Sequence, residues 1–148
     1  MKKFWINFRG GSMSPLLQDG DVILIEEVVM EDLKCGDIIL FFDQENKLMI
    51  LHRLLDFSAQ TKGDFSFYSE NTSFDNYFGR AIQIKRNEQY ITLPSKNSML
   101  NLIYLKLSKL RMRGCLMRKL AYLGLLILTI IFEFCSDKTK PDHREWPM

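Results

Sequence analysis

The chain has 148 residues, of which 47% are apolar and 26% are charged, and its formal net charge is +2. This composition supports one modest core with room for an appended segment. The near-neutral charge argues against nucleic-acid binding by the protein as a whole. Cys35, Cys115 and Cys135 are odd in number and far apart, which excludes a paired metal motif and an evident disulfide framework, so we expect reduced thiols.

The first eleven residues, MKKFWINFRGG, combine a basic opening with a short apolar stretch. Asn7 and Arg9 interrupt that stretch, which is too short for the apolar region of a signal peptide. We therefore expect neither cleavage nor a membrane span at this end.

Up to about residue 94 the pattern is that of β-strands. Short runs rich in Ile, Leu and Phe alternate with turn clusters such as Gly-Asp, Asp-Gln-Glu-Asn and Lys-Gly-Asp. The runs leave no room for crossover helices, so they predict a mainly β fold, a small antiparallel domain over residues 1–94. The predicted strands are 21–27, 37–43, 47–57, 65–70 and 80–87.

From residue 95 the pattern changes to that of a basic amphipathic helix. Ser95 or Ser98 is a suitable first residue, and apolar side chains follow at positions 100, 103, 107 and 110. Lysine and arginine are interleaved with them. Residues 95–148 thus form a second unit, which ends in a polar tail.

Residues 120–132 contain no charge. At about 1.5 Å per residue this stretch is about 20 Å long, short of the roughly 30 Å hydrocarbon core of a membrane. Flanking charged side chains that reach the interface would extend the usable segment to residues 116–135. We therefore predict a C-terminal apolar segment that spans or lies on a membrane, with a buried core helix as the alternative. If it spans, the basic residues before it favour a cytoplasmic β domain.

Ser12 lies in the stretch FRGGSMSP, directly before a predicted strand. A serine is a weak nucleophile unless a base accepts its proton and N–H groups stabilise the oxyanion that forms. The alternative is an ordinary turn residue. Of the two histidines, His143 lies in the polar tail, whereas His52 lies in the apolar run LMILHRLL, where it is either a general base or a packed core residue.

Two carboxylates follow in the stretch YSENTSFDNYFG, Glu70 and Asp75. Either one would orient an imidazole and stabilise its charged form. The alternative is an Asx turn between strands.

Four sequence boxes in this order resemble the type I signal peptidase family, in particular its archaeal and endoplasmic-reticulum-like branch. The resemblance covers about residues 9 to 86. The boxes are Gly10-x-Ser12-Met13-x-Pro15, Gly36-Asp37-Ile38 with Phe41, the His52-Arg53 pair, and a late acidic box in which Ser69-Glu70 replaces the family's Gly-Asp.

This resemblance implies a serine endopeptidase that uses neither metal nor cofactor. Ser12 would be the nucleophile and His52 the general base, with Asp75 as the first and Glu70 as the second candidate for the supporting acid. The oxyanion and substrate-binding region would comprise Gly10, Gly11 and Met13. The implied substrates are signal or leader peptides with small residues before the scissile bond, bound extended along a sheet edge. Because such a base must be neutral, we expect the rate to fall below about pH 6.5.

The apolar segment follows the catalytic boxes, whereas the family carries its membrane anchor before the nucleophile. This difference suggests a specialised protease for leader peptides, or a peripheral enzyme on anionic lipid. The other function classes are a catalytically inactive, membrane-associated binding module of the same fold and a self-cleaving regulator of the related SOS-repressor peptidase fold. The expected partners are peptide substrates and membrane lipid, not nucleic acid. Oligomeric state and the need for a partner subunit stay open.

Overall fold

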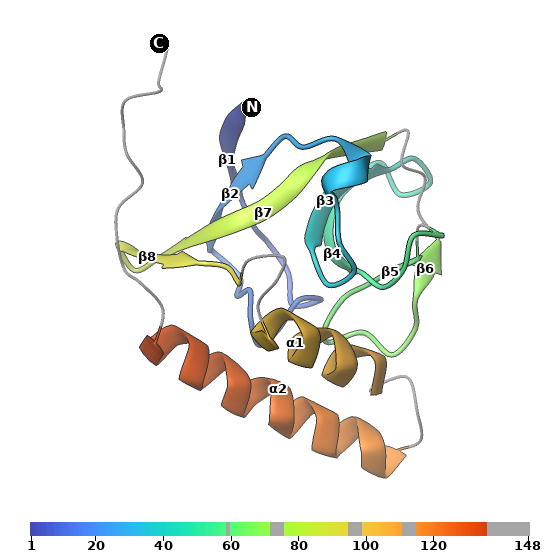
Figure 1. The fold of residues 1–148 in the computed structure, drawn as a ribbon, viewed down its shortest axis with the longest axis vertical. Helices are drawn as coiled ribbons and strands as arrows, with labels where there is room; N and C mark the ends of the chain where they lie inside the picture. Colours follow the sequence, from blue (N-terminus) through green and yellow to red (C-terminus); the bar gives the residue numbers. More distant parts are fainter. Residues whose placement is uncertain (59, 72–75, 95–98, 111–114, 136–148) are drawn as a thin grey trace.

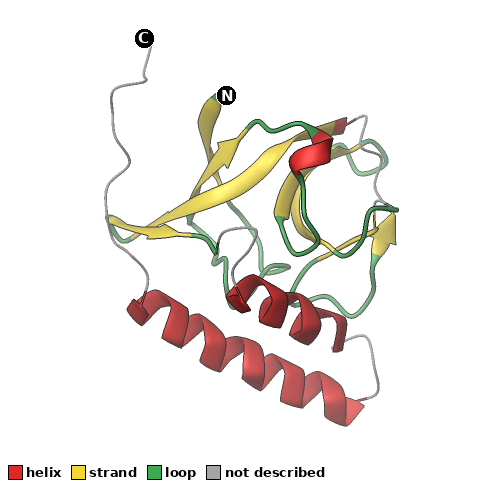
Figure 2. Ribbon diagram, viewed as in Figure 1, coloured by secondary structure: helices red, strands yellow, loops and turns green. Residues whose placement is uncertain are grey.

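The structure, a computed structural model, describes residues 1–58, 60–71, 76–94, 99–110 and 115–135, without the side chains of residues 115 and 133–135. Its strands form one sheet, and its two α-helices form a separate layer beside it (Figures 1 and 2). The strands are β1 (Lys3–Asn7), β2 (Val22–Glu26), β3 (Ile38–Asp43), β4 (Leu48–Leu54), β5 (Gln60–Lys62), β6 (Glu70–Asn71), β7 (Tyr77–Arg86) and β8 (Gln89–Thr92). The helices are the short 3-10 helix η1 (Met30–Asp32), α1 (Met99–Leu110) and α2 (Cys115–Cys135).

All strand pairs are antiparallel, as the sequence predicted. The order across the sheet is β1-β2-β7-β3-β4-β5-β6, and β8 pairs with β7. The long strand β7 pairs with β3 near its start and with β2 and β8 further along, so it joins the two halves of the sheet. Register shifts in the β2–β7 and β3–β7 pairs mark bulges, which bend and twist a sheet locally.

Four of the five predicted strands are present, as β2, β3, β4 and β7. The predicted strand 65–70 is wrong, since only its last residue enters a strand, β6. The backbone of this stretch does not pair with a neighbouring strand at Phe65. The N–H of Phe65 donates instead to the carbonyl oxygen of Ser12 in the β1–β2 connection, at 2.7 Å. The sequence analysis also missed β1, β5 and β8, of which β5 has only three residues.

The basic amphipathic helix is present, but its inward face includes residues that were not predicted. The buried residues of α1 are Asn101, Tyr104, Leu105 and Ser108. Of the predicted apolar positions, Leu100 and Leu107 are half-buried and pack against the core, whereas Ile103 is exposed. Polar residues face the sheet because buried charged groups there bind them, as described below.

One hydrophobic core contains residues from both predicted units. Phe8, Met13 and Leu16 of the first unit cluster with Tyr104 of α1 and with Leu125, Leu128 and Phe132 of α2. The predicted boundary between residues 94 and 95 thus separates two parts that pack together. No helix in the described part of the chain is long and apolar enough to cross a membrane.

Candidate active site

Ser12 lies in the connection between β1 and β2, which hydrogen bonds fold into a tight loop. Gly10, whose φ is +104°, donates its N–H to Oδ1 of Asp19 at 2.7 Å, and Ser14 donates its N–H to the carbonyl of Gly11 at 3.1 Å. Glycine adopts positive φ without steric cost, which explains its place at the first turn position. The side chain of Met13 is fully buried and anchors the loop in the core.

The predicted oxyanion region can be examined donor by donor. The N–H of Gly10 is already used by Asp19. Over the described residues, no hydrogen bond is recorded from the N–H of Ser12 or of Met13. The N–H of Gly11 is likewise without a hydrogen bond among the described residues. The N–H groups of Gly11, Ser12 and Met13 are therefore the candidate donors for an oxyanion formed at Ser12.

Ser12 and His52 line the same cleft, which has a volume of about 530 Å³. One wall comes from β1 and the residues after it, and the other comes from β3 and β4. The remaining lining is largely apolar: Ile6, Phe8, Leu40, Leu48, Met49, Ile50 and Leu51, with Asn7 and Arg9. The two residues that the sequence selected as nucleophile and base thus lie on the walls of one cleft, and no hydrogen bond joins their side chains.

The cleft also has unpaired strand edges. Among the described strands, β1 pairs only with β2, and residues 48–52 of β4 pair only with β3. Each strand therefore keeps one row of backbone groups free, and an extended peptide binds to such an edge by adding a strand.

His52 lies on β4 opposite Ile39 of β3, and the residue is 5% exposed. The ring stands edge-on to Phe41, with the centroids 6.3 Å apart. Its Nδ1 lies 3.3 Å from Oε2 of Glu70, within ion-pair distance but outside the alignment of a hydrogen bond. With Nδ1 facing the carboxylate, Nε2 is the ring nitrogen left to accept a proton.

Glu70 comes from β6, and about half of its side chain is exposed. Its contact with the His52 ring is the main reason that its pKa lies below the usual value; partial burial and the charge of Asp43 act in the opposite direction. A carboxylate that stays ionised beside an imidazole can orient the ring and stabilise its protonated form. Asp75, the other candidate acid, lies outside the described residues, so its role stays a prediction.

Gly63 packs directly against the Ser12 turn. A β-carbon at this position would come within 2.5 Å of the Ser12 carbonyl oxygen and 3.0 Å of its Cβ. The next contact comes from Phe65, through the hydrogen bond to the same carbonyl. The loop after β5 therefore supports the backbone of the candidate nucleophile.

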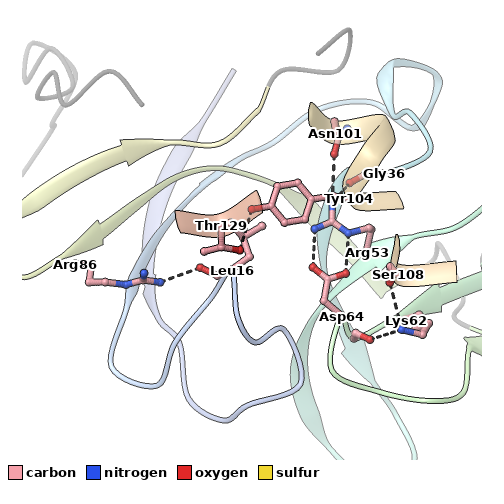
Figure 3. Close-up of polar contacts among 11 residues, drawn as sticks. Leu16, Gly36, Arg53, Lys62, Asp64, Arg86, Asn101, Tyr104, Ser108 and Thr129 are labelled. Carbon is pink, nitrogen blue, oxygen red and sulfur yellow. Dashed lines mark hydrogen bonds and ion pairs between the residues drawn. The ribbon is translucent and has the colours of Figure 1, made fainter. Parts of the chain in front are cut away.

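A buried ion pair connects this loop to β4 (Figure 3). Arg53, next to His52 on β4, donates from Nε and Nη2 to both carboxylate oxygens of Asp64, at 2.8 and 2.6 Å. Its Nη1 donates to the carbonyl of Gly36 and to Oδ1 of Asn101 on α1. Burial alone lowers the pKa of Arg53, but the charge of Asp64 and the hydrogen bonds to it outweigh that effect, and the pKa is raised. Both side chains are almost fully buried, so removal of either partner would leave the other buried without its partner.

Lys62 is also fully buried in this loop (Figure 3). Its Nζ donates to the carbonyl of Gly63 at 2.9 Å and to the hydroxyl of Ser108 on α1 at 3.2 Å.

A second ion pair lies at the end of the loop that carries Ser12. Arg86 of β7 donates to both carboxylate oxygens of Asp21 and to the carbonyl of Leu16. This charged pair therefore fixes that end of the loop.

Residues 62–64 were missed by the sequence analysis as parts of a site. The sequence Lys62-Gly63-Asp64 is typical of a solvent-exposed turn. Its composition does not indicate that the side chains of Lys62 and Asp64 are buried. The only available signal was the Gly-Asp pair itself, lying between His52 and Glu70. Over the described residues, no group of three or more His, Cys, Asp or Glu side chains is arranged to hold a metal ion.

Comparison with protein-family models, with curated proteins and with solved structures found no match to this chain.

Proposed function

We propose that the protein is a serine endopeptidase of the signal-peptidase type, which cleaves signal or leader peptides. The observation that supports this most strongly is that Ser12 and His52, which the sequence selects independently of the structure, line one cleft. His52 has a carboxylate partner in Glu70, and the N–H groups of the Ser12 turn include some that make no hydrogen bond among the described residues. Nucleophile, base, orienting acid and oxyanion donors are the parts that acyl transfer requires.

In the proposed reaction, the Ser12 hydroxyl attacks the peptide carbonyl and its proton passes to Nε2 of His52. The N–H groups of Ser12 and Met13 stabilise the oxyanion of the tetrahedral intermediate. Protonated His52, beside the negative charge of Glu70, then gives its proton to the leaving amine, and an acyl-enzyme remains on Ser12. Water attacks this ester with the same base, which releases the new carboxyl end and regenerates the serine.

An extended substrate fits the cleft because the free edges of β1 and β4 supply backbone hydrogen bonds. The apolar walls suit small apolar side chains before the scissile bond, in line with the family resemblance. Under this proposal, Gly63-Asp64 is a better match for the family's Gly-Asp pair than Ser69-Glu70. Gly63 packs against Ser12 and Asp64 binds the arginine after His52.

Cleavage of a pool of synthetic peptides, analysed by mass spectrometry, tests the proposal. The peptides carry Ala, Gly or Ser before one bond, and a matched pool carries Phe or Trp there. We expect cleavage after the small residues, loss of about a thousandfold or more with Ser12→Ala, and a comparable loss with His52→Gln. Ser14→Ala, two residues further along the same turn, is the matched control and keeps its activity.

Unchanged cleavage by Ser12→Ala would refute the mechanism. If the native chain binds the peptides without cleaving them, the inactive binding module is the better description. Peptide binding is measured by fluorescence anisotropy with the same pool, so the two outcomes can be told apart.

A further inference from the structure

The outer face of α2 is a continuous apolar stripe. Leu116, Leu120, Leu123, Ile127, Ile130 and Ile131 are each between 48% and 69% exposed. Their spacing of three or four residues places them on one side of the helix. The opposite side of α2 faces the protein interior: Leu125 and Phe132 belong to the shared core, and Ala121 is fully buried. The stripe therefore has no partner among the described residues of this chain.

Basic residues accompany the apolar stripe. Between residues 99 and 132 the sequence contains six Lys or Arg and no Asp or Glu; the first acid after them is Glu133. Removing these six from the chain's 20 basic residues leaves 14 against 18 acidic ones, so the rest of the protein is net negative. The positive charge of this protein is thus concentrated in residues 99–132.

Charge and apolar surface coincide in space. Lys119 is exposed and lies three residues after Leu116 and four before Leu123, within the stripe itself. On α1, Lys106 is exposed in line with Leu102 and Ile103, which are 53% and 36% exposed. Basic groups around an exposed apolar face are the signature of a helix that lies in a membrane interface.

We propose that the outer face of the α1–α2 pair docks on an anionic lipid surface, with α2 parallel to the membrane. The aliphatic side chains enter the boundary between headgroups and acyl chains, and Lys106 and Lys119 contact lipid phosphates. The buried inner face keeps its contacts with the β-sheet. This inference goes beyond the proposed function and does not depend on catalysis.

Docking would bring the membrane next to the candidate site. Tyr122 of α2 stands edge-on to Phe65, with the ring centroids 5.7 Å apart, and the backbone of Phe65 binds the carbonyl of Ser12. The guanidinium of Arg118 lies over the ring of Phe67, 4.7 Å from its centroid. The same loop therefore touches both the docking helix and the Ser12 turn.

Co-sedimentation of the full chain with vesicles tests the proposal. One set of vesicles contains phosphatidylcholine alone, and the other also contains phosphatidylglycerol. We expect binding to the anionic vesicles, which weakens with added salt. The double variant Leu123→Glu/Ile127→Glu loses this binding, whereas Val29→Glu/Met30→Glu, which adds the same charge at exposed apolar positions elsewhere, retains it.

A second variant separates charge from apolar burial and covers the case in which the first does not fold. Lys106→Gln/Lys119→Gln should weaken binding to anionic vesicles by about 25-fold, about fivefold for each charge. Failure of the native chain to sediment with anionic vesicles would overturn the proposal. So would a native dimer in light scattering that Leu123→Glu/Ile127→Glu converts to a monomer, because the stripe would then join two copies of the chain.

Discussion

Gly63 touches the backbone of Ser12 so closely that no other residue fits at its position: an added β-carbon would stand 2.5 Å from the Ser12 carbonyl oxygen. This contact joins the loop after β5 to the turn that presents the candidate nucleophile. Neighbouring side chains extend the connection to α1 through Lys62 and to β4 through Asp64. The position of Ser12 thus depends on residues that are distant in the sequence.

Gly63→Ala should force the Ser12 turn to move. Because the clash is with backbone, we expect a loss of about 1–3 kcal/mol in the free energy of unfolding, together with loss of any Ser12-dependent cleavage. Thermal unfolding measures the first effect. Gly11→Ala is the stability control, since a β-carbon there meets nothing within 4 Å. Equal melting temperatures for the two variants would contradict the close contact.

Arg53→Met should destabilise the protein by about 3–5 kcal/mol, because it leaves the buried carboxylate of Asp64 without its partner. The double variant Arg53→Met/Asp64→Leu should recover most of this loss, since no buried charge remains. Urea unfolding of the single and double variants measures the difference. The exposed pair Lys85–Glu88 provides the control, and Glu88→Gln should leave the urea midpoint nearly unchanged.

The contact between Glu70 and His52 should make stability depend on pH. The pKa of Glu70 is lower in the folded protein than its ordinary value of 4.5. The carboxylate therefore contributes stability that is fully present above pH 4.5 and is lost as the pH falls through the folded value. The contribution should stay below about 1 kcal/mol because the side chain is half exposed.

Melting temperatures of the native chain and of Glu70→Gln, compared from about pH 6 to about pH 3, test this prediction. We expect the native chain to be the more stable at the upper end and the difference to vanish at the lower end. A difference that grows with acidity has the opposite sign and would exclude the ionised contact.

The hydrogen bond between Tyr104 of α1 and Thr129 of α2 should stabilise the packing of the two helices. Their hydroxyl oxygens lie 2.9 Å apart in a buried site. Thr129→Val keeps the shape of the side chain but removes the hydroxyl, so we expect a loss of about 1 kcal/mol. A double-mutant cycle with Tyr104→Phe isolates the interaction, and additive losses would show that the two groups are not coupled.

The elements that the sequence predicted correctly are those whose pattern is local. The strands β2, β3, β4 and β7 are short runs rich in apolar residues between turn signals, and such runs form strands in many contexts. The predicted strand 65–70 failed because Phe65 uses its backbone N–H to bind Ser12. The hydrophobic pattern of α1 did not predict that Asn101 and Ser108 are buried, because these side chains bind Arg53 and Lys62. A hydrophobic pattern contains no information on such partners.

The sequence by itself determined the antiparallel β class, the helical C-terminal part and the selection of Ser12 and His52, because these depend on local periodicity and on short motifs. Only the tertiary structure decided that the two residues share a cleft and that Glu70 reaches the imidazole. It also decided that the KGD turn is buried beneath Ser12. These relationships depend on which strands pair and on which charged side chains are buried in contact with each other. A single sequence does not contain this information.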